Sequence, residues 1–260
     1  MIIKLPFLPW DLNIQRHARN KAAPPHQPPI QPTPPQPTPP QPTPPQTIIK
    51  RNNYTKIFCI GSNKTGTTSL EKLFSLFGFE LGNQAAAEIL SLDWLINKNP
   101  ERIIKYCYTA DAFQDVPFSY PGLFKELDKA FPNSKFILTV RNSPDEWFKS
   151  LVRFHTNVFS SDPTRPPSED ELANATYRYK GYAFEIMALL YGYPKTSLYD
   201  ESAYKNHYVT DNDEKRTYFK DRPNDFIEIN LAVKEDFLRL CDFLGVETNI
   251  NDFPWLNRSE

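Results

Sequence analysis

The stretch KIFCIGSNKTGTTSL (residues 56–70) decides the fold of this chain. It opens with a run of apolar, β-branched and aromatic residues, which is typical of a strand buried on both faces. After Gly61 and a short polar loop, apolar residues recur with helical spacing over residues 70–77. A strand, a glycine loop and a helix in this order direct backbone N–H groups and a helix N-terminus towards an anion.

The loop also carries a charge and several hydroxyls. Lys64 adds the positive charge, and further hydrogen-bond donors come from Thr65, Thr67, Thr68 and Ser69. Loops that bind nucleoside triphosphates have lysine directly after the second glycine, in the pattern G-x-x-x-x-G-K-[ST]. Here Lys64 lies two residues before Gly66, so this pattern is not met. An ordinary glycine turn before a helix is the alternative interpretation.

The sequence KTGTT (residues 64–68) resembles the K-[ST]-G-T-[ST] loop of sulfotransferases that use 3′-phosphoadenosine 5′-phosphosulfate (PAPS). In that family the loop binds the 5′-phosphosulfate, and its lysine contacts the oxygen that bridges phosphate and sulfate. The resemblance therefore implies PAPS binding by the loop and the first helical turn, at Lys64, Thr65, Gly66, Thr67, Thr68 and Ser69.

Strand-like and helix-like segments alternate along the chain. Strands are predicted at 106–117, 135–141 and 225–231. Helices are predicted at 84–106, 121–131, 169–190, 202–219 and 236–244, with one more after Pro144. The alternation predicts an α/β domain over residues 51–260, with a mostly parallel, P-loop-like sheet flanked by helices.

Arg141 marks a second anion site, because it ends the predicted strand at 135–141. Ligands of such sheets bind at the carboxyl ends of the strands, and a guanidinium there can bind a phosphate with two hydrogen bonds. In the resembled family an arginine at this place and a serine on the next helix hold the 3′-phosphate. Ser150 is the matching serine here, one residue further from the arginine than usual, and Ser143 is the alternative.

The C-terminal region extends the resemblance. The segments FLRLCDFLGV (237–246) and FPWLN (253–257) are similar to the end of the family's domain, and the segment 219–231 is similar to the part before it. The resemblance spans about residues 54–258. It implies transfer of a sulfuryl group from PAPS to a hydroxyl or amine, with no metal ion required.

The reaction needs a group that accepts a proton and a group that stabilises the leaving phosphate oxygen. Lys64 is predicted to stabilise that oxygen. Cytosolic members of the family have a histidine at the end of the second strand, where this chain has Asp115 followed by Pro117. We therefore predict Asp115 as the base and Asp111 as the second choice, although Asp115 also suits a simple turn or cap. His155 and His207 are weaker candidates for the base.

Composition restricts the remaining possibilities. The net charge is −1 and the pI is near 6.5, so no broad basic surface indicates nucleic acid as a partner. The three cysteines lie far apart among apolar residues, which is typical of buried thiols. No apolar run reaches the roughly 18 residues needed to span a bilayer, and the apolar N-terminus is a poor signal peptide. A cytoplasmic protein is expected.

The first residues differ in composition from the rest. Residues 24–46 are rich in proline and contain three copies of QPTPP, which predicts an extended polyproline linker. Its Pro-x-x-Pro pattern also fits a ligand for SH3 or WW modules. Residues 1–23 are predicted to be a leader, which is either disordered or a docking peptide.

Two other classes of function stay open from the sequence. One is a P-loop kinase for a small molecule, which would need Mg²⁺ and a lysine directly after the second glycine. The other is a non-catalytic scaffold that acts through the proline-rich arm. If the protein is a sulfotransferase, the aromatic residues of 155–215 suit a small-molecule, carbohydrate or lipid-like acceptor, or a peptide tyrosine.

Overall fold

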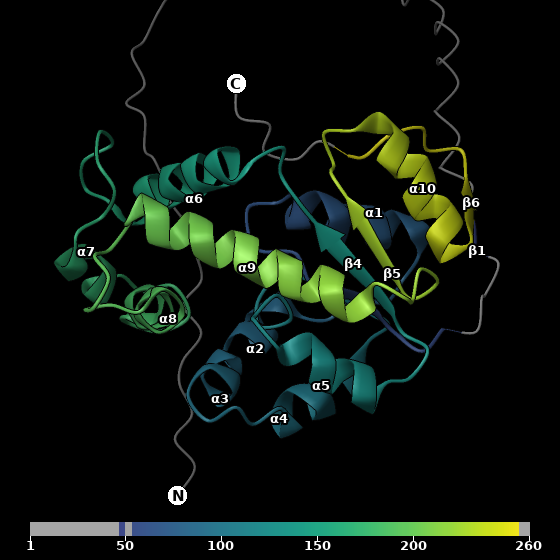
Figure 1. The fold of residues 1–260 in the computed structure, drawn as a ribbon, viewed down its shortest axis with the longest axis horizontal. Coiled ribbons are helices and arrows are strands. Elements are labelled where there is room, and N and C mark those ends of the chain that lie inside the picture. Colours follow the sequence, from purple (N-terminus) through teal and green to yellow (C-terminus); the bar gives the residue numbers. More distant parts are fainter. Residues whose placement is uncertain (1–46, 50–53, 255–260) are drawn as a thin grey trace, which may run out of the picture. The chain divides into compact units, whose positions relative to one another are not determined.

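The computed structural model describes residues 47–49 (backbone only) and 54–254. Its centre is a parallel sheet of four strands in the order β3-β2-β4-β5 (Figure 1). The strands are β2 (Ile57–Cys59), β3 (Ala112–Phe113), β4 (Lys135–Thr139) and β5 (Phe226–Ile229). The prediction of an α/β fold with a parallel sheet flanked by helices is thereby confirmed. The predicted leader and proline-rich linker lie outside the described residues.

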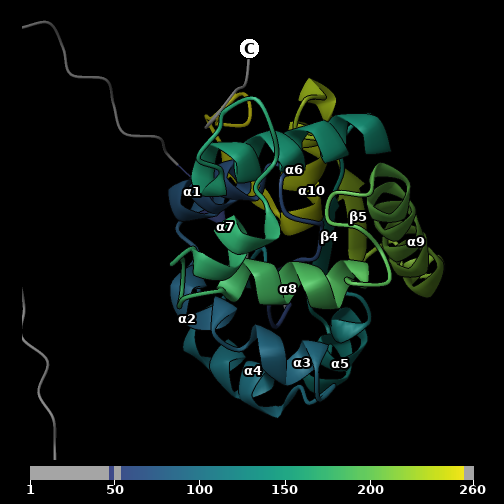
Figure 2. The same cartoon turned by 90° about the vertical axis from the view of Figure 1, so that its left-hand side faces the viewer.

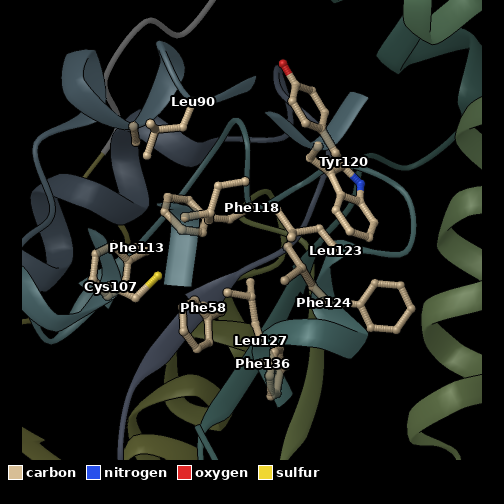
Figure 3. Packing of buried hydrophobic residues seen from close by; sticks show 14 of the residues in the cluster. Phe58, Leu90, Cys107, Phe113, Phe118, Tyr120, Leu123, Phe124, Leu127 and Phe136 are labelled. Atoms are coloured by element: carbon tan, nitrogen blue, oxygen red, sulfur yellow. The ribbon is translucent and has the colours of Figure 1, made fainter. Parts of the chain in front are cut away.

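Successive residues of β2 face opposite sides of the sheet, as strand geometry requires. Ile57 and Cys59 pack against the helices α1 (Thr67–Phe77) and α10 (Lys234–Leu244). On the other face, Phe58 stacks between Phe113 and Phe136, with ring centroids 5.6 and 5.5 Å away (Figure 3). Both faces of the central strand are therefore buried, as its apolar sequence predicts.

Short helices cover the Phe58 face of the sheet. They are α2 (Gln84–Glu88), α3 (Ser91–Leu95), α4 (Glu101–Tyr106), the 3₁₀ turn η1 (Cys107–Thr109) and α5 (Leu123–Ala130). A separate antiparallel pair joins β1 (Thr47–Ile49) to β6 (Val246–Thr248) beside α10. The sheet thus lies between α1 and α10 on one side and these short helices on the other.

The remaining helices form a third group, and the longest of them reaches back along the sheet, where Phe219 stacks on Phe226 of β5. They are α6 (Pro144–Phe159), α7 (Glu169–Asn174), α8 (Tyr182–Tyr191) and α9 (Glu201–Phe219). Figure 2 shows α8 between α6 and the layer of α3, α4 and α5. Trp147 of α6 stacks on Tyr208 of α9 with ring centroids 4.5 Å apart. This third group provides the wall that faces the strand ends.

Two predicted elements differ from the structure on the Phe58 face. The predicted helix at 84–106 is divided into α2, α3 and α4, and Lys98 has a left-handed φ of 50° before Pro100. The predicted strand at 106–117 contains only Ala112 and Phe113 as strand residues. Ile103 and Cys107 are one helical turn apart and fully buried, so packing favours a helix where the sequence favoured a strand.

The predicted helix at 169–190 is also interrupted. It consists of α7 and α8, and the segment 175–181 between them is not helical. The backbone N–H of Gly181 instead donates to the carbonyl of Ala175, 2.9 Å away, and closes a loop. This interruption places Tyr177 and Arg178 outside the helices, where both line the cavity described below. The predicted helix at 202–219 is confirmed as α9.

All three cysteines are buried free thiols. Within residues 47–49 and 54–254, no helix is long and apolar enough to cross a membrane. In the C-terminal segment, Phe253 is buried against Phe237. The last residues of that segment, from 255 on, lie outside the described part of the chain.

Gly61 follows β2 at a point where the chain touches the end of β4. A Cβ atom on Gly61 would lie 2.5 Å from the carbonyl oxygen and 2.6 Å from the nitrogen of Thr139. We therefore expect Gly61→Ala to lower the free energy of unfolding by about 3 kcal/mol, because backbone atoms must move apart. Urea unfolding followed by circular dichroism measures this change.

Gly78→Ala is the matched control, because no atom lies within 4 Å of the added Cβ and only the left-handed φ of 85° is strained. We expect a loss of about 1–2 kcal/mol there. An equal or smaller loss at Gly61 would show that the contact with Thr139 does not constrain the loop.

Candidate active site

The loop between β2 and α1 ends at Gly66, which has a φ of 105° and precedes the first helical turn. A Cβ atom at this position would lie 2.7 Å from Cδ2 of Leu231, so both backbone conformation and space require glycine. Gly66 provides no side-chain cap for α1. The first N–H groups of a helix point out of its N-terminus, and here that end opens into a cavity lined by Gly66, Thr67 and Thr68.

Thr65 has a structural place in this loop. Its hydroxyl lies 2.6 Å from the carbonyl oxygen of Ser62 and 2.5 Å from the hydroxyl of Thr139. The side chain is 2% exposed and does not line the cavity. Thr65 thus attaches the loop to the end of β4, whereas the neighbouring predicted residues Lys64, Gly66, Thr67, Thr68 and Ser69 line the cavity.

Lys64 is held in an unusual conformation, with a φ of 68°. Its ammonium lies 3.8 Å from the ring centroid of Phe154, a cation–π contact with α6. Burial lowers the pKa of Lys64, the Asp115 carboxylate opposes this effect, and the cations Arg141 and Arg153 lower the pKa further. Several positive charges therefore gather at this point, which is the electrostatic requirement for an anion site.

Arg141 joins the second predicted anion site to the loop. Its Nε donates to the carbonyl oxygen of Lys64 at 2.8 Å, and its Nη1 donates to Oε1 of Glu146 at 3.2 Å. Among the described residues, Nη2 of Arg141 makes no hydrogen bond. The ends of β2 and β4 thereby place Lys64 and Arg141 on one cavity.

Ser143 and Ser150, the two candidate partners of Arg141, differ in their places on α6. The hydroxyl of Ser143 accepts a hydrogen bond from the N–H of Glu146 at 3.1 Å and caps this helix. Ser150 lies two turns later, is buried, and lines the same cavity as Arg141. The geometry therefore favours Ser150 as the partner of Arg141.

Asp115 follows β3 and lines the cavity between the loop and α2. Its Oδ2 accepts from the hydroxyl of Thr67 at 2.9 Å, and its Oδ1 accepts from the N–H of Val116 at 2.9 Å. The pKa of Asp115 is raised, first by burial and further by the nearby Glu88 carboxylate. The hydrogen bonds from Thr67 and Val116 and the charge of Lys64 lower it in part. A raised pKa suits a carboxylate that accepts a proton.

The other predicted proton acceptors have different surroundings. Asp111 is exposed at the opposite, amino end of β3 and does not line the cavity. His155 does line it, but burial and Lys64 lower its pKa to about 3, and its Nδ1 lies 3.0 Å from the Tyr199 hydroxyl. Burial also lowers the pKa of His207. Of the predicted bases, Asp115 has the most suitable position and pKa.

The cavity has a volume of about 700 Å³ and includes residues that the sequence did not single out. Phe154 could have been found, because it lies one helical turn after Ser150. The ion pair of Arg178 with the buried Glu88 joins segments that are distant in the sequence, so no local sequence pattern indicates it. The same holds for Gln84 and Gln114, whose side chains meet at 3.4 Å.

Fold and site together define an α/β protein with a cavity that gathers Lys64, Arg141 and Arg153 beyond the carboxyl ends of a parallel sheet. A family model described as "Sulfotransferase domain" matches residues 56–260, and the chain belongs to this family. The domain is thus that of an enzyme that transfers a sulfuryl group. A search of curated proteins gave no match. Among the described residues, no group of three or more His, Cys, Asp or Glu could hold a metal ion.

The raised pKa of Asp115 has a consequence for stability. The folded protein binds the Asp115 proton more tightly than the unfolded chain does. The resulting contribution to the free energy of unfolding is fully present below the ordinary pKa of 3.8, and it is lost as the pH rises through the raised pKa. We therefore expect Asp115→Asn to raise the melting temperature at pH 7. Each ~1 kcal/mol gained in the free energy of unfolding corresponds to a rise of about 2–4 °C. Asparagine tolerates the φ of 60° found at this position.

Thermal unfolding between pH 4 and pH 8 measures this effect, with Asp111→Asn, at the other end of β3, as the control. The gain of Asp115→Asn over the wild type should grow with pH and be small near pH 4. A melting temperature that falls at pH 7 would mean that the Asp115 charge stabilises the fold.

Proposed function

We propose that this protein transfers a sulfuryl group from PAPS to a hydroxyl or amine of an acceptor. The observation that carries the proposal is the hydrogen bond from Arg141 Nε to the Lys64 carbonyl, 2.8 Å long. It connects two cationic positions that line one cavity. A nucleotide with charged groups at both its 5′ and 3′ positions matches two such positions better than a ligand with one charged end.

The residues present fit the charges of the proposed donor. The N-terminus of α1, with Lys64, Thr67, Thr68 and Ser69, would bind the 5′-phosphosulfate. Arg141 and Ser150 would bind the 3′-phosphate. Gly66 allows the left-handed turn, with a φ of 105°, that ends the loop and starts α1 at the cavity. When bound, PAPS supplies a sulfuryl group that is attached to a phosphate leaving group.

The residues of the chain have separate tasks in the proposed reaction. Lys64 neutralises the negative charge that grows on the leaving oxygen, and it does so in a partly buried site where charge interactions are strong. Asp115 accepts the proton of the acceptor's hydroxyl or amine. The Thr67 hydroxyl, 2.9 Å from Asp115 Oδ2, orients this carboxylate. Phe154 positions the Lys64 ammonium from the side of α6.

Nucleotide binding provides the first test. We expect 3′-phosphoadenosine 5′-phosphate at about 100 times its Kd to stabilise the protein by about 2.7 kcal/mol. Arg141→Ala should weaken this binding about tenfold or more, because a charged hydrogen bond is lost. Isothermal titration calorimetry and thermal shift measure both effects. Stabilisation by ATP with Mg²⁺ instead would support the kinase, and binding of neither nucleotide would support the scaffold.

Lys64→Met tests the assignment of the leaving-group residue. Methionine keeps an apolar side chain over Phe154, so the fold is expected to remain while the transfer rate falls about 100-fold or more. The rate of sulfate transfer from labelled PAPS at saturating donor is the measurement. Lys72→Met is the control on α1, because Lys72 is exposed and does not line the cavity. A Lys64→Met variant with nearly normal turnover would remove Lys64 from the mechanism.

A further inference from the structure

Two buried oxygens in the cavity wall have no hydrogen-bond partner among the described residues. They are Oε1 of Gln114 and Oδ1 of Asp211. Gln114 is 6% exposed and Asp211 is 4% exposed, so bulk water does not satisfy them. Buried polar atoms are normally paired, and both of these oxygens can only accept a hydrogen bond. Each therefore calls for an N–H or O–H donor.

The orientation of the Gln114 amide follows from its neighbours. Its Nε2 lies 3.5 Å from a carboxylate oxygen of Glu71, which can only accept, and 3.4 Å from Oε1 of Gln84. Gln84 is oriented in turn, because its Nε2 donates to the carbonyl of Val116 at 2.7 Å. This chain of hydrogen bonds leaves Oε1 of Gln114 as the end of the amide without a partner among the described residues.

Asp211 is positioned by a fully buried lysine. Its Oδ2 pairs with Nζ of Lys215, which also donates to the carbonyl of Ser119 at 3.1 Å. The N–H of Ser119 donates to the carbonyl of Asp115 at 3.0 Å, so this pair supports the segment that carries the proposed base. Asp211 lines the cavity from α9, and its buried Oδ1 has no partner among the described residues.

Negative charge distinguishes this part of the cavity from the part around Lys64. Glu71, Glu88, Asp115 and Asp211 all line the cavity. Arg178 pairs with Glu88 and Lys215 pairs with Asp211, so Glu71 and Asp115 carry the excess negative charge here. An anionic acceptor would approach carboxylates here, which is electrostatically unfavourable. An uncharged or cationic acceptor would not meet this repulsion.

An apolar strip completes this part of the wall. It comes from one helix, α8, whose contributing residues are Ala183, Ile186, Met187, Leu190 and Tyr191. Apolar side chains with a few polar groups between them are the usual lining of a small-molecule site. A ligand that fills this space therefore has an apolar body beside its polar groups.

We infer that the acceptor is an uncharged or cationic compound with an apolar body and at least two N–H or O–H donors, which Gln114 and Asp211 bind. This inference rests on the proposed sulfuryl transfer. Gln114 and Asp211 are thereby assigned to recognition of the acceptor. The residues proposed to bind PAPS lie at the ends of the other strands.

Matched acceptors test the inference with the full chain and labelled PAPS. One set is tyramine, tyrosol and 4-hydroxyphenylacetate, with 4-ethylphenol as the member that has no second donor. The other set is octyl glucosaminide, octyl glucoside and octyl glucuronide. In at least one set, we expect kcat/KM of the ammonium or hydroxyl member to exceed that of the carboxylate member by about tenfold or more, which corresponds to ~1.4 kcal/mol.

The outcomes separate the two proposals. A preference for the carboxylate members or for 4-ethylphenol overturns the inference, and so does a lack of transfer to every compound while 3′-phosphoadenosine 5′-phosphate still binds. Failure of that nucleotide to bind overturns the proposed function instead.

Substitutions test the two residues directly. Gln114→Met and Asp211→Asn should each raise KM for the best acceptor about three- to tenfold, the effect of one hydrogen bond, and leave nucleotide affinity unchanged. Asp213→Asn is the control, because Asp213 is exposed on α9 and pairs with Arg216. Unchanged KM in both variants, or an equal loss of nucleotide affinity, overturns the assignment. If Asp211→Asn unfolds because Lys215 loses its partner, Gln114→Met decides.

Discussion

The attachment of the loop after β2 to the end of β4 is the constraint on which the site depends. Gly61 touches the backbone of Thr139, Thr65 bonds to the Thr139 hydroxyl, and Arg141 bonds to the Lys64 carbonyl. The indole N–H of Trp147 donates to the Asn63 carbonyl at 3.0 Å from the side of α6. These contacts fix the loop from two elements, and they keep Lys64 in a left-handed conformation that an isolated chain would rarely adopt.

The same arrangement brings unlike charges close together at a cost. Burial lowers the pKa of Lys64 and raises the pKa of Asp115, so each charge is less favourable there than in water. Each of the two charges favours ionisation of the other, and this partly offsets the cost of burial. A site that holds poorly solvated charges without a ligand is typical of enzymes, where stability is given up for function.

The part of the site that the sequence predicted is the part built from local segments. The β2 strand, the glycine loop and the start of α1 are contiguous, and Arg141 follows a strand that is apolar along its length. The spacing between Arg141 and Ser150 left Ser143 as an alternative, because only the capping bond to Glu146 shows where α6 begins. The sequence predicts Thr65 as a ligand residue, but its hydroxyl contacts Thr139, and a contact between such distant segments leaves no local signal.

The side of the cavity formed by α2, α8 and α9 could not be predicted in this way, because contacts between distant segments create it. Tyr177 and Arg178 reach the cavity only because the chain leaves its helix between α7 and α8, and Arg178 then pairs with Glu88 from α2. Gln114 and Asp211 are ordinary polar residues in the sequence, and only their burial without partners distinguishes them. The proposed binding of PAPS and the proposed choice of acceptor thus have different physical origins in this protein. The first comes from strand ends and a helix N-terminus, and the second from the packing of α2, α8 and α9 against them.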